Sequence, residues 1–152
     1  MQPRYDAFKA APGAMAAMRG LQDYVNKCGL EASLLELVKT RASQINGCAF
    51  CIHMHTRDAR ARGESEERLY LLDAWRESPL YSDRERAALA WTESLTLVAE
   101  TRVPDEVYDE ARRHFSEKEL TDLTLAVVAI NGWNRIMVAS RASHPVAKEK
   151  AA

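Results

Sequence analysis

The sequence predicts an all-α fold in a single domain, and three observations support this prediction. Apolar residues recur at steps of three and four along most of the chain, the spacing of one buried helix face. Ser82 with Glu85, and Ser116 with Glu119, each match the capping box that begins a helix. No stretch shows the alternation of apolar and polar residues that is typical of a strand. We therefore expect a bundle of about six to seven helices.

The first two expected helices have clear start and stop signals. The first begins at Pro12, because proline suits the first helical position, and ends near Cys28, before Gly29 as a C-terminal cap. Cys28 lies on the apolar face of this helix and is expected in the core. The second helix contains the apolar run 34–45 and ends at the turn dipeptide 46–47.

Five more helices are expected after this turn. They cover residues 48–63, 65–78, a segment from 82, 104–115 and 117–141. The last is the longest, and the dipeptide 131–132 is a candidate kink within it. No linker, repeat or low-complexity segment separates these helices, so one domain is expected to span residues 1–152.

Composition and charge exclude several classes of function. The chain is 47% hydrophobic and 28% charged with a net charge of −1, so it lacks the basic excess typical of nucleic-acid binding. Its longest apolar run, 123–130, is far shorter than the roughly 20 residues of a membrane span. Its N-terminus has charges where a secretory signal would be apolar. We expect a cytoplasmic protein with no nucleic-acid or membrane partner, in a compartment that keeps thiols reduced.

The segment INGCAFCIHMH, residues 45–55, carries the pattern most indicative of chemistry. On a helix with about 100° per residue, Cys48, Cys51 and His55 share one face. Cys48 falls in the first turn, where the helix dipole and free N–H groups favour a thiolate. His55 can reach Cys51 across one turn, and two cysteines one turn apart can close a disulfide. These spacings favour redox chemistry.

Other roles for the two cysteines follow from the residues alone. Covalent haem attachment fails, because Ile52 stands where a c-type motif requires histidine. An iron–sulfur cluster would need a fourth cysteine, and the chain has three. A zinc site stays open, since Cys48, Cys51 and His55 are three suitable ligands. Packing of both thiols in the core also stays open.

The wider pattern, E…CxxCxxxH, resembles the AhpD-like alkylhydroperoxidases of the carboxymuconolactone decarboxylase superfamily. Glu36 stands twelve residues before Cys48, as the glutamate of that family does. The resemblance continues through CIHMHTRDARARGE and AINGWNRIMVASR and covers about residues 12–142. The decarboxylase branch lacks the cysteine pair, so the pair favours the peroxidase branch. The sequence departs from the best-known members at Ala49 and Phe50, since these members carry a histidine between the cysteines.

The resemblance implies a thiol-dependent reductase of organic hydroperoxides or hydrogen peroxide. Cys51 is expected to attack the peroxide and become a sulfenic acid, and the more accessible Cys48 to resolve it to a disulfide. His55 would transfer protons, and Glu36 would orient it. A dithiol reductant, either a lipoyl-bearing adaptor or a thioredoxin-like protein, is implied, with no cofactor and no metal. Short relatives form trimers or hexamers, so a homo-oligomer is expected.

A second function class stays open beside the peroxidase, namely a redox-responsive or zinc-binding module without turnover. Residues outside the motif are expected to be structural. Trp133 and Asn134 match the closing helix of the family, and a packing role is expected for both. The aromatic residues expected in the core or in subunit contacts are Trp75, Tyr81 and Trp91.

Overall fold

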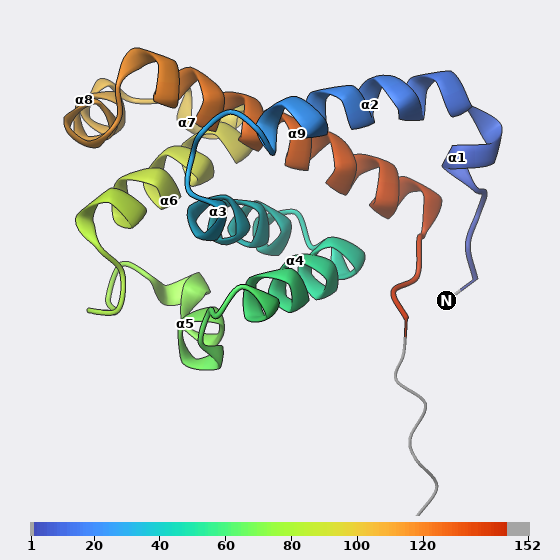
Figure 1. Cartoon of the computed structure of the whole chain (residues 1–152), viewed down its shortest axis with the longest axis horizontal. Helices are drawn as coiled ribbons and strands as arrows, with labels where there is room; N and C mark the ends of the chain where they lie inside the picture. The colour runs from blue at the N-terminus through green and yellow to red at the C-terminus, as the bar shows by residue number, and fades with distance from the viewer. Residues whose placement is uncertain (1, 146–152) are drawn as a thin grey trace, which may run out of the picture.

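Nine α-helices and one 3-10 helix make up the described part of the chain, residues 2–145 of the computed structural model (Figure 1). This part contains no β-strand, so the all-α prediction is confirmed. The elements are α1 (Ala7–Ala10), α2 (Pro12–Val25), α3 (Ala32–Ile45), α4 (Ala49–Ala61), α5 (Glu66–Tyr70), the 3-10 helix η1 (Leu72–Ala74), α6 (Asp83–Thr96), α7 (Val98–Thr101), α8 (Asp105–His114) and α9 (Glu117–Ser140).

The described residues hold more elements than the six to seven helices expected, because several are very short. α1 and α7 have four residues each, too few to show helical periodicity in the sequence. The helix expected over 65–78 divides into α5 and η1. α2 ends at Val25, before the expected boundary, so Cys28 lies after the helix and only partly buried against the core.

The predicted capping boxes are present at the start of α6 and α9. In each, the serine oxygen accepts from the backbone N–H of the glutamate three residues later, whose carboxylate accepts from the serine N–H. α9 is continuous from Glu117 to Ser140, and the kink expected at 131–132 does not interrupt it. Gly132 instead gives room to Met18 of α2, whose Cε would lie 2.9 Å from an added Cβ.

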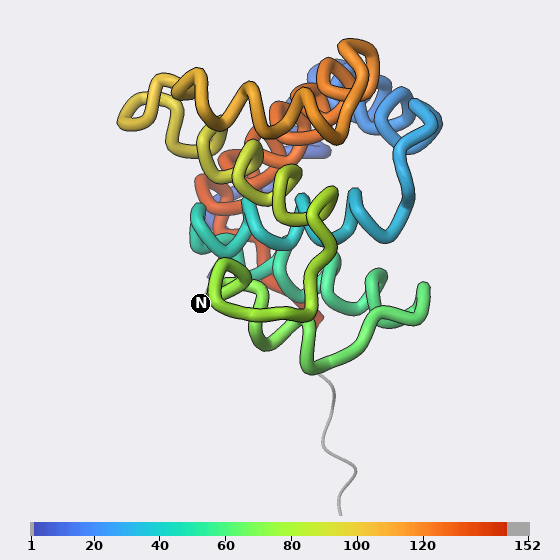
Figure 2. The backbone as a smooth tube through the Cα atoms, turned by 90° about the vertical axis from the view of Figure 1, so that its left-hand side faces the viewer, coloured from blue at the N-terminus to red at the C-terminus, as the bar shows by residue number. Residues whose placement is uncertain are grey.

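α3 is the central helix of the fold, and α4, α6 and α9 pack around it (Figure 1). Its mid-section is buried on every side, with Leu37 and Val38 removed completely from solvent. α8 lies over α6 at one end of the bundle, and both views show this arrangement (Figures 1 and 2). Trp75, Tyr81 and Trp91 are buried, as expected of core residues. α3 is buried on all sides, yet it carries two charged residues near its centre, Glu36 and Lys39.

The chain's beginning is attached to the end of α9. The backbone N–H of Arg4 donates to the carbonyl oxygen of Ser140 at 2.9 Å, and its guanidinium donates to the carbonyl oxygen of Ala139. α1 follows directly and lies beside the last turns of α9 (Figure 1). Residues separated by almost the whole sequence therefore meet at one end of the bundle.

α9 is long and apolar enough to cross a membrane by length and composition alone. It also packs against α2, α3 and α6, and 44% of its most apolar window is buried within the chain. Buried core helices pass the same test of length and composition, so this finding alone does not identify a membrane span. The expected cytoplasmic location and absence of a membrane partner stay predictions.

Candidate active site

The turn between α3 and α4 brings the four predicted site residues together. Gly47 takes the left-handed conformation, with φ +64°, that reverses the chain here. α4 then returns alongside α3, and His55 Nδ1 lies 2.9 Å from Glu36 Oε2. Cys48 and Cys51 lie at the start of α4, about two turns and one turn before His55. All four side chains are buried.

The two thiols of the motif are in direct contact. Cys48 is the N-cap of α4, and its Sγ accepts a hydrogen bond from the backbone N–H of Cys51 at 3.4 Å. The two Sγ atoms are 2.7 Å apart. The hydrogen bond from the Cys51 thiol lowers the pKa of Cys48 to about 7, against burial and with help from the Cys51 N–H. The same contact, together with burial, raises the pKa of Cys51.

Cys48 is not the more accessible of the two thiols, so that expectation is wrong. Each cysteine is 1% exposed. Both thiols belong to an apolar cluster with Ile130 and Met137 of α9. Cys51, one turn later, lines a cavity of about 570 Å³, and Cys48 does not. Access from solvent therefore favours Cys51.

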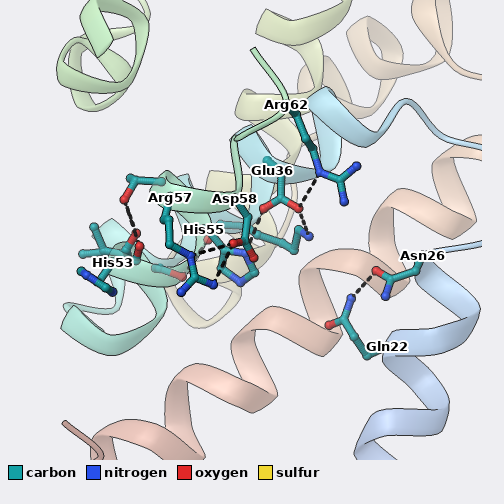
Figure 3. Close-up of polar contacts among 12 residues, drawn as sticks. Gln22, Asn26, Glu36, His53, His55, Arg57, Asp58 and Arg62 are labelled. Carbon is teal, nitrogen blue, oxygen red and sulfur yellow. Dashed lines mark hydrogen bonds and ion pairs between the residues drawn. The ribbon is translucent and has the colours of Figure 1, made fainter. Parts of the chain in front are cut away.

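Glu36 is a buried carboxylate with a partner on each oxygen. Oε2 contacts His55, and Oε1 accepts from Lys39 Nζ at 2.7 Å (Figure 3). Burial raises the pKa of Glu36, but the hydrogen bond from His55 and the charge of Lys39 outweigh it and lower the pKa overall. An unpaired carboxylate at this depth would cost on the order of several kcal/mol. Glu36 is therefore a buried, paired carboxylate and not a solvated charge on the helix surface.

A cavity of about 570 Å³ lies between α2, α3, α4 and α9 and opens onto Cys51 and His55. Across it, the side chains of Gln22 and Asn26 on α2 bond to each other and face the Glu36 side of the site (Figure 3). Its apolar lining is formed by Phe8, Leu30, Leu35, Phe50, Met54, Trp133 and Met137. The volume and lining suit an organic molecule much larger than hydrogen peroxide.

The chain matches the model of the carboxymuconolactone decarboxylase family over residues 12–94, more than half of its length. It belongs to this family. Two curated relatives are uncharacterised proteins. YdfG of Bacillus subtilis is 45% identical over 139 residues, which are 91% of this chain and 95% of YdfG. YnjA of Escherichia coli is 33% identical over 98 residues, 64% of this chain and 53% of YnjA.

Solved structures place the chain among AhpD-like members of the carboxymuconolactone decarboxylase family. A protein of unknown function from Agrobacterium tumefaciens, described as a candidate antioxidant defence protein AhpD, is 46% identical with a TM-score of 0.93. The match covers 95% of this chain and 99% of that protein. The debrominase Bmp8 has a TM-score of 0.82 at 19% identity, over 91% of this chain and 75% of Bmp8. At that identity the likeness shows the shared fold alone.

Three residues of this family member's site were missed in the sequence or given only a structural role. Lys39 stands one turn after Glu36, and this i, i+3 spacing of opposite charges was a signal that could have found it. Trp133 was expected to be structural, but it lines the cavity. Phe8 stacks on Trp133 with ring centroids 6.3 Å apart, and nothing local in the sequence links these two residues.

Asn134 is buried, and its amide joins α9 to the C-terminal end of α3, just before the thiols. Its Nδ2 donates to Ser43 Oγ at 3.0 Å, and its Oδ1 accepts from Asn46 Nδ2 at 2.9 Å. The Asn134 side chain also contributes to lowering the pKa of Cys48, after the contacts with Cys51. The expected packing role is therefore compatible with the contacts, which also place this amide beside the thiols.

The three residues considered as zinc ligands, Cys48, Cys51 and His55, are not arranged to bind a metal ion. Among residues 2–145, no group of three or more His, Cys, Asp or Glu side chains is arranged to hold a metal ion. His55 directs one ring nitrogen to Glu36, and the two thiols bond to each other. The arrangement of these side chains gives the zinc alternative no support.

Proposed function

We propose that this protein is a thiol-dependent hydroperoxide reductase in which Cys51 reacts with the peroxide. The observation that carries the proposal is the placement of Cys51 and His55 on the wall of one cavity, with the Cys48 sulfur 2.7 Å from that of Cys51. A peroxide in the cavity would meet one thiol and one proton carrier together, with a resolving thiol already in contact. Membership of the family and the AhpD-like relative support the same reading.

The proposed first step is attack by the Cys51 thiolate on the terminal oxygen of the peroxide ROOH. His55 takes the Cys51 proton, the O–O bond breaks, and Cys51 becomes a sulfenic acid. The departing alkoxide receives the proton from His55 and leaves as ROH. Glu36 bonds the other ring nitrogen, so it holds the imidazole in place while the proton is carried.

The proposed second step closes the disulfide. The Cys48 thiolate attacks the Cys51 sulfur, the S–S bond forms, and hydroxide leaves as water after taking a proton from solvent. The lowered pKa of Cys48 in the reduced pair is in keeping with this role, because the thiolate is the form of a cysteine that attacks. A dithiol reductant would then return both cysteines to thiols, and we propose a lipoyl-bearing adaptor or a thioredoxin-like protein as its class.

Thiol titration separates this function from a module without turnover. The reduced protein is titrated with a chromogenic thiol reagent before and after one equivalent of tert-butyl hydroperoxide. Loss of two thiols per chain is expected, followed by continuous turnover when dihydrolipoamide or thioredoxin is supplied. A Cys28→Ser variant, which keeps the pair, is the control and should lose the same two thiols. Thiols that react only after a chelator is added would instead indicate the zinc-binding module.

We also propose that the chain assembles as a homo-oligomer. Val128 and Val138 of α9 are 52% and 49% exposed, although the same helix is buried on its other faces. Half-exposed apolar side chains on a long helix gain stability when a second copy covers them. Light scattering on a gel-filtered sample at micromolar concentration should give a mass several times 17.1 kDa. A mass of one chain would contradict the proposal.

A further inference from the structure

We propose that Lys39 is a positioning residue of this site, whose buried ammonium group balances the charge of Glu36 and fixes the carboxylate that holds His55. The inference deepens the proposed function, because it concerns the same thiols and the same proton carrier. Lys39 lines the cavity, yet the proposed cycle assigns it no step. A buried lysine is rare enough to require a reason.

The contact between Lys39 and Glu36 is the closest ion pair of the site. Lys39 Nζ lies 2.7 Å from Glu36 Oε1, and the side chains are 7% and 6% exposed. The opposite oxygen, Oε2, contacts His55 Nδ1. One carboxylate therefore joins a permanent cation on α3 to the imidazole on α4. Because Oε1 is bonded to Lys39, the carboxylate is held in the orientation that directs Oε2 to His55.

Lys39 differs in its burial from the neighbouring cation, Arg62. Arg62 of α4 also approaches Oε1, at 4.0 Å, but its side chain is 55% exposed (Figure 3). The other charged groups that face the cavity are Asp58 of α4 and Arg19 of α2. α9 contributes Trp133 and Met137, which carry no charge. Lys39 is thus the buried cation of the site, and water screens the exposed Arg62 far more strongly.

Charge balance links Lys39 to the thiols. With Lys39 present, the Glu36–Lys39 pair carries no net charge. The pair therefore does not oppose the loss of a proton from the thiols. Without the ammonium group, the buried carboxylate would add one negative charge to the wall of the cavity that Cys51 also lines. A nearby like charge disfavours ionisation, so the thiolate would form at higher pH. Removing both charges together would cancel this effect.

Thiolate titration of the reduced protein tests the inference. The ultraviolet absorbance of the thiolate is followed against pH in the wild type, Lys39→Met and the matched control Arg62→Met. Lys39→Met should raise the midpoint by about half to one pH unit, and Arg62→Met should move it by about 0.2 unit or less. The double variant Glu36→Gln with Lys39→Met should return close to the wild-type midpoint. Damage to the fold would not be repaired by a second substitution.

A folded Lys39→Met with the wild-type midpoint would overturn the inference, as would a double variant shifted as far as the single one. Circular dichroism and the melting temperature establish folding, and Lys39→Gln replaces the methionine variant if that one does not fold. The titration needs no peroxide. A protein without peroxide turnover that still shows the shift would therefore refute the proposed function and leave the role of Lys39 standing.

Discussion

Cys51→Ser is expected to abolish peroxide turnover, because it removes the thiol that faces the cavity. A serine hydroxyl is too weakly acidic to replace the thiolate as a nucleophile at neutral pH, so no residual cycle is expected. Cys48→Ser should also stop turnover but leave the first step intact. Its Cys51 would then accumulate as a sulfenic acid, because the neighbouring thiol that resolves it is gone.

Dimedone labelling and mass spectrometry distinguish the two cysteines. After one equivalent of tert-butyl hydroperoxide, Cys48→Ser should carry the dimedone adduct on Cys51. Cys28→Ser is the matched control, since this third cysteine lies outside the motif and only partly buried; its turnover should equal the wild type. Turnover by Cys51→Ser, with an adduct on Cys48, would reverse the assigned roles. Because the pKa of Cys48 is lowered, attack on the peroxide by Cys48 is the main alternative to the proposed roles.

His55→Ala and Glu36→Gln are each expected to slow peroxide reduction by roughly 10²-fold or more, the scale of a positioned proton-transfer group. His55 carries the proton, and Glu36 holds its ring through the 2.9 Å contact. Because the two residues serve one relay, the double variant should lose little more than either single variant. The measurement is the rate of thiol oxidation in a single turnover, which does not depend on the reductant.

A matched control for this second prediction is His53→Ala, on the same helix but outside the cavity lining. It should react at the wild-type rate. Losses of His55→Ala and Glu36→Gln that multiply in the double variant would show two independent roles. A Glu36→Gln variant at the wild-type rate would remove this glutamate from the mechanism and leave its burial as a packing feature.

The helices and the pairing of Glu36 with His55 were predictable because their signals are local. Capping boxes at Ser82 and Ser116 lie within four residues, and the Glu36–His55 contact needs only two helices joined by a tight turn. The family pattern then singled out this glutamate from the other acidic residues of the chain. Local spacing could likewise have indicated Lys39, one turn further along α3.

What the sequence could not provide depends on contacts between distant segments. Cys48 is buried because Ile130 and Met137 of α9 cover it, and a helix wheel of residues 48–55 does not contain that information. The one difference between the thiols, that Cys51 lines the cavity and Cys48 does not, likewise depends on how these helices pack. The cavity wall at Trp133 depends on Phe8, more than a hundred residues away in the chain.

The attachment of residues 4–8 to the end of α9 affects how the protein can be handled and how it can diverge. Phe8 lies outside the segment that matches the family model, yet it forms part of the cavity wall. Deleting residues 4–8 would remove part of this wall, so substrate preference should be measured on protein that keeps this segment. Among relatives, substitutions in this short leading segment can reshape the pocket while every residue of the cysteine motif stays the same.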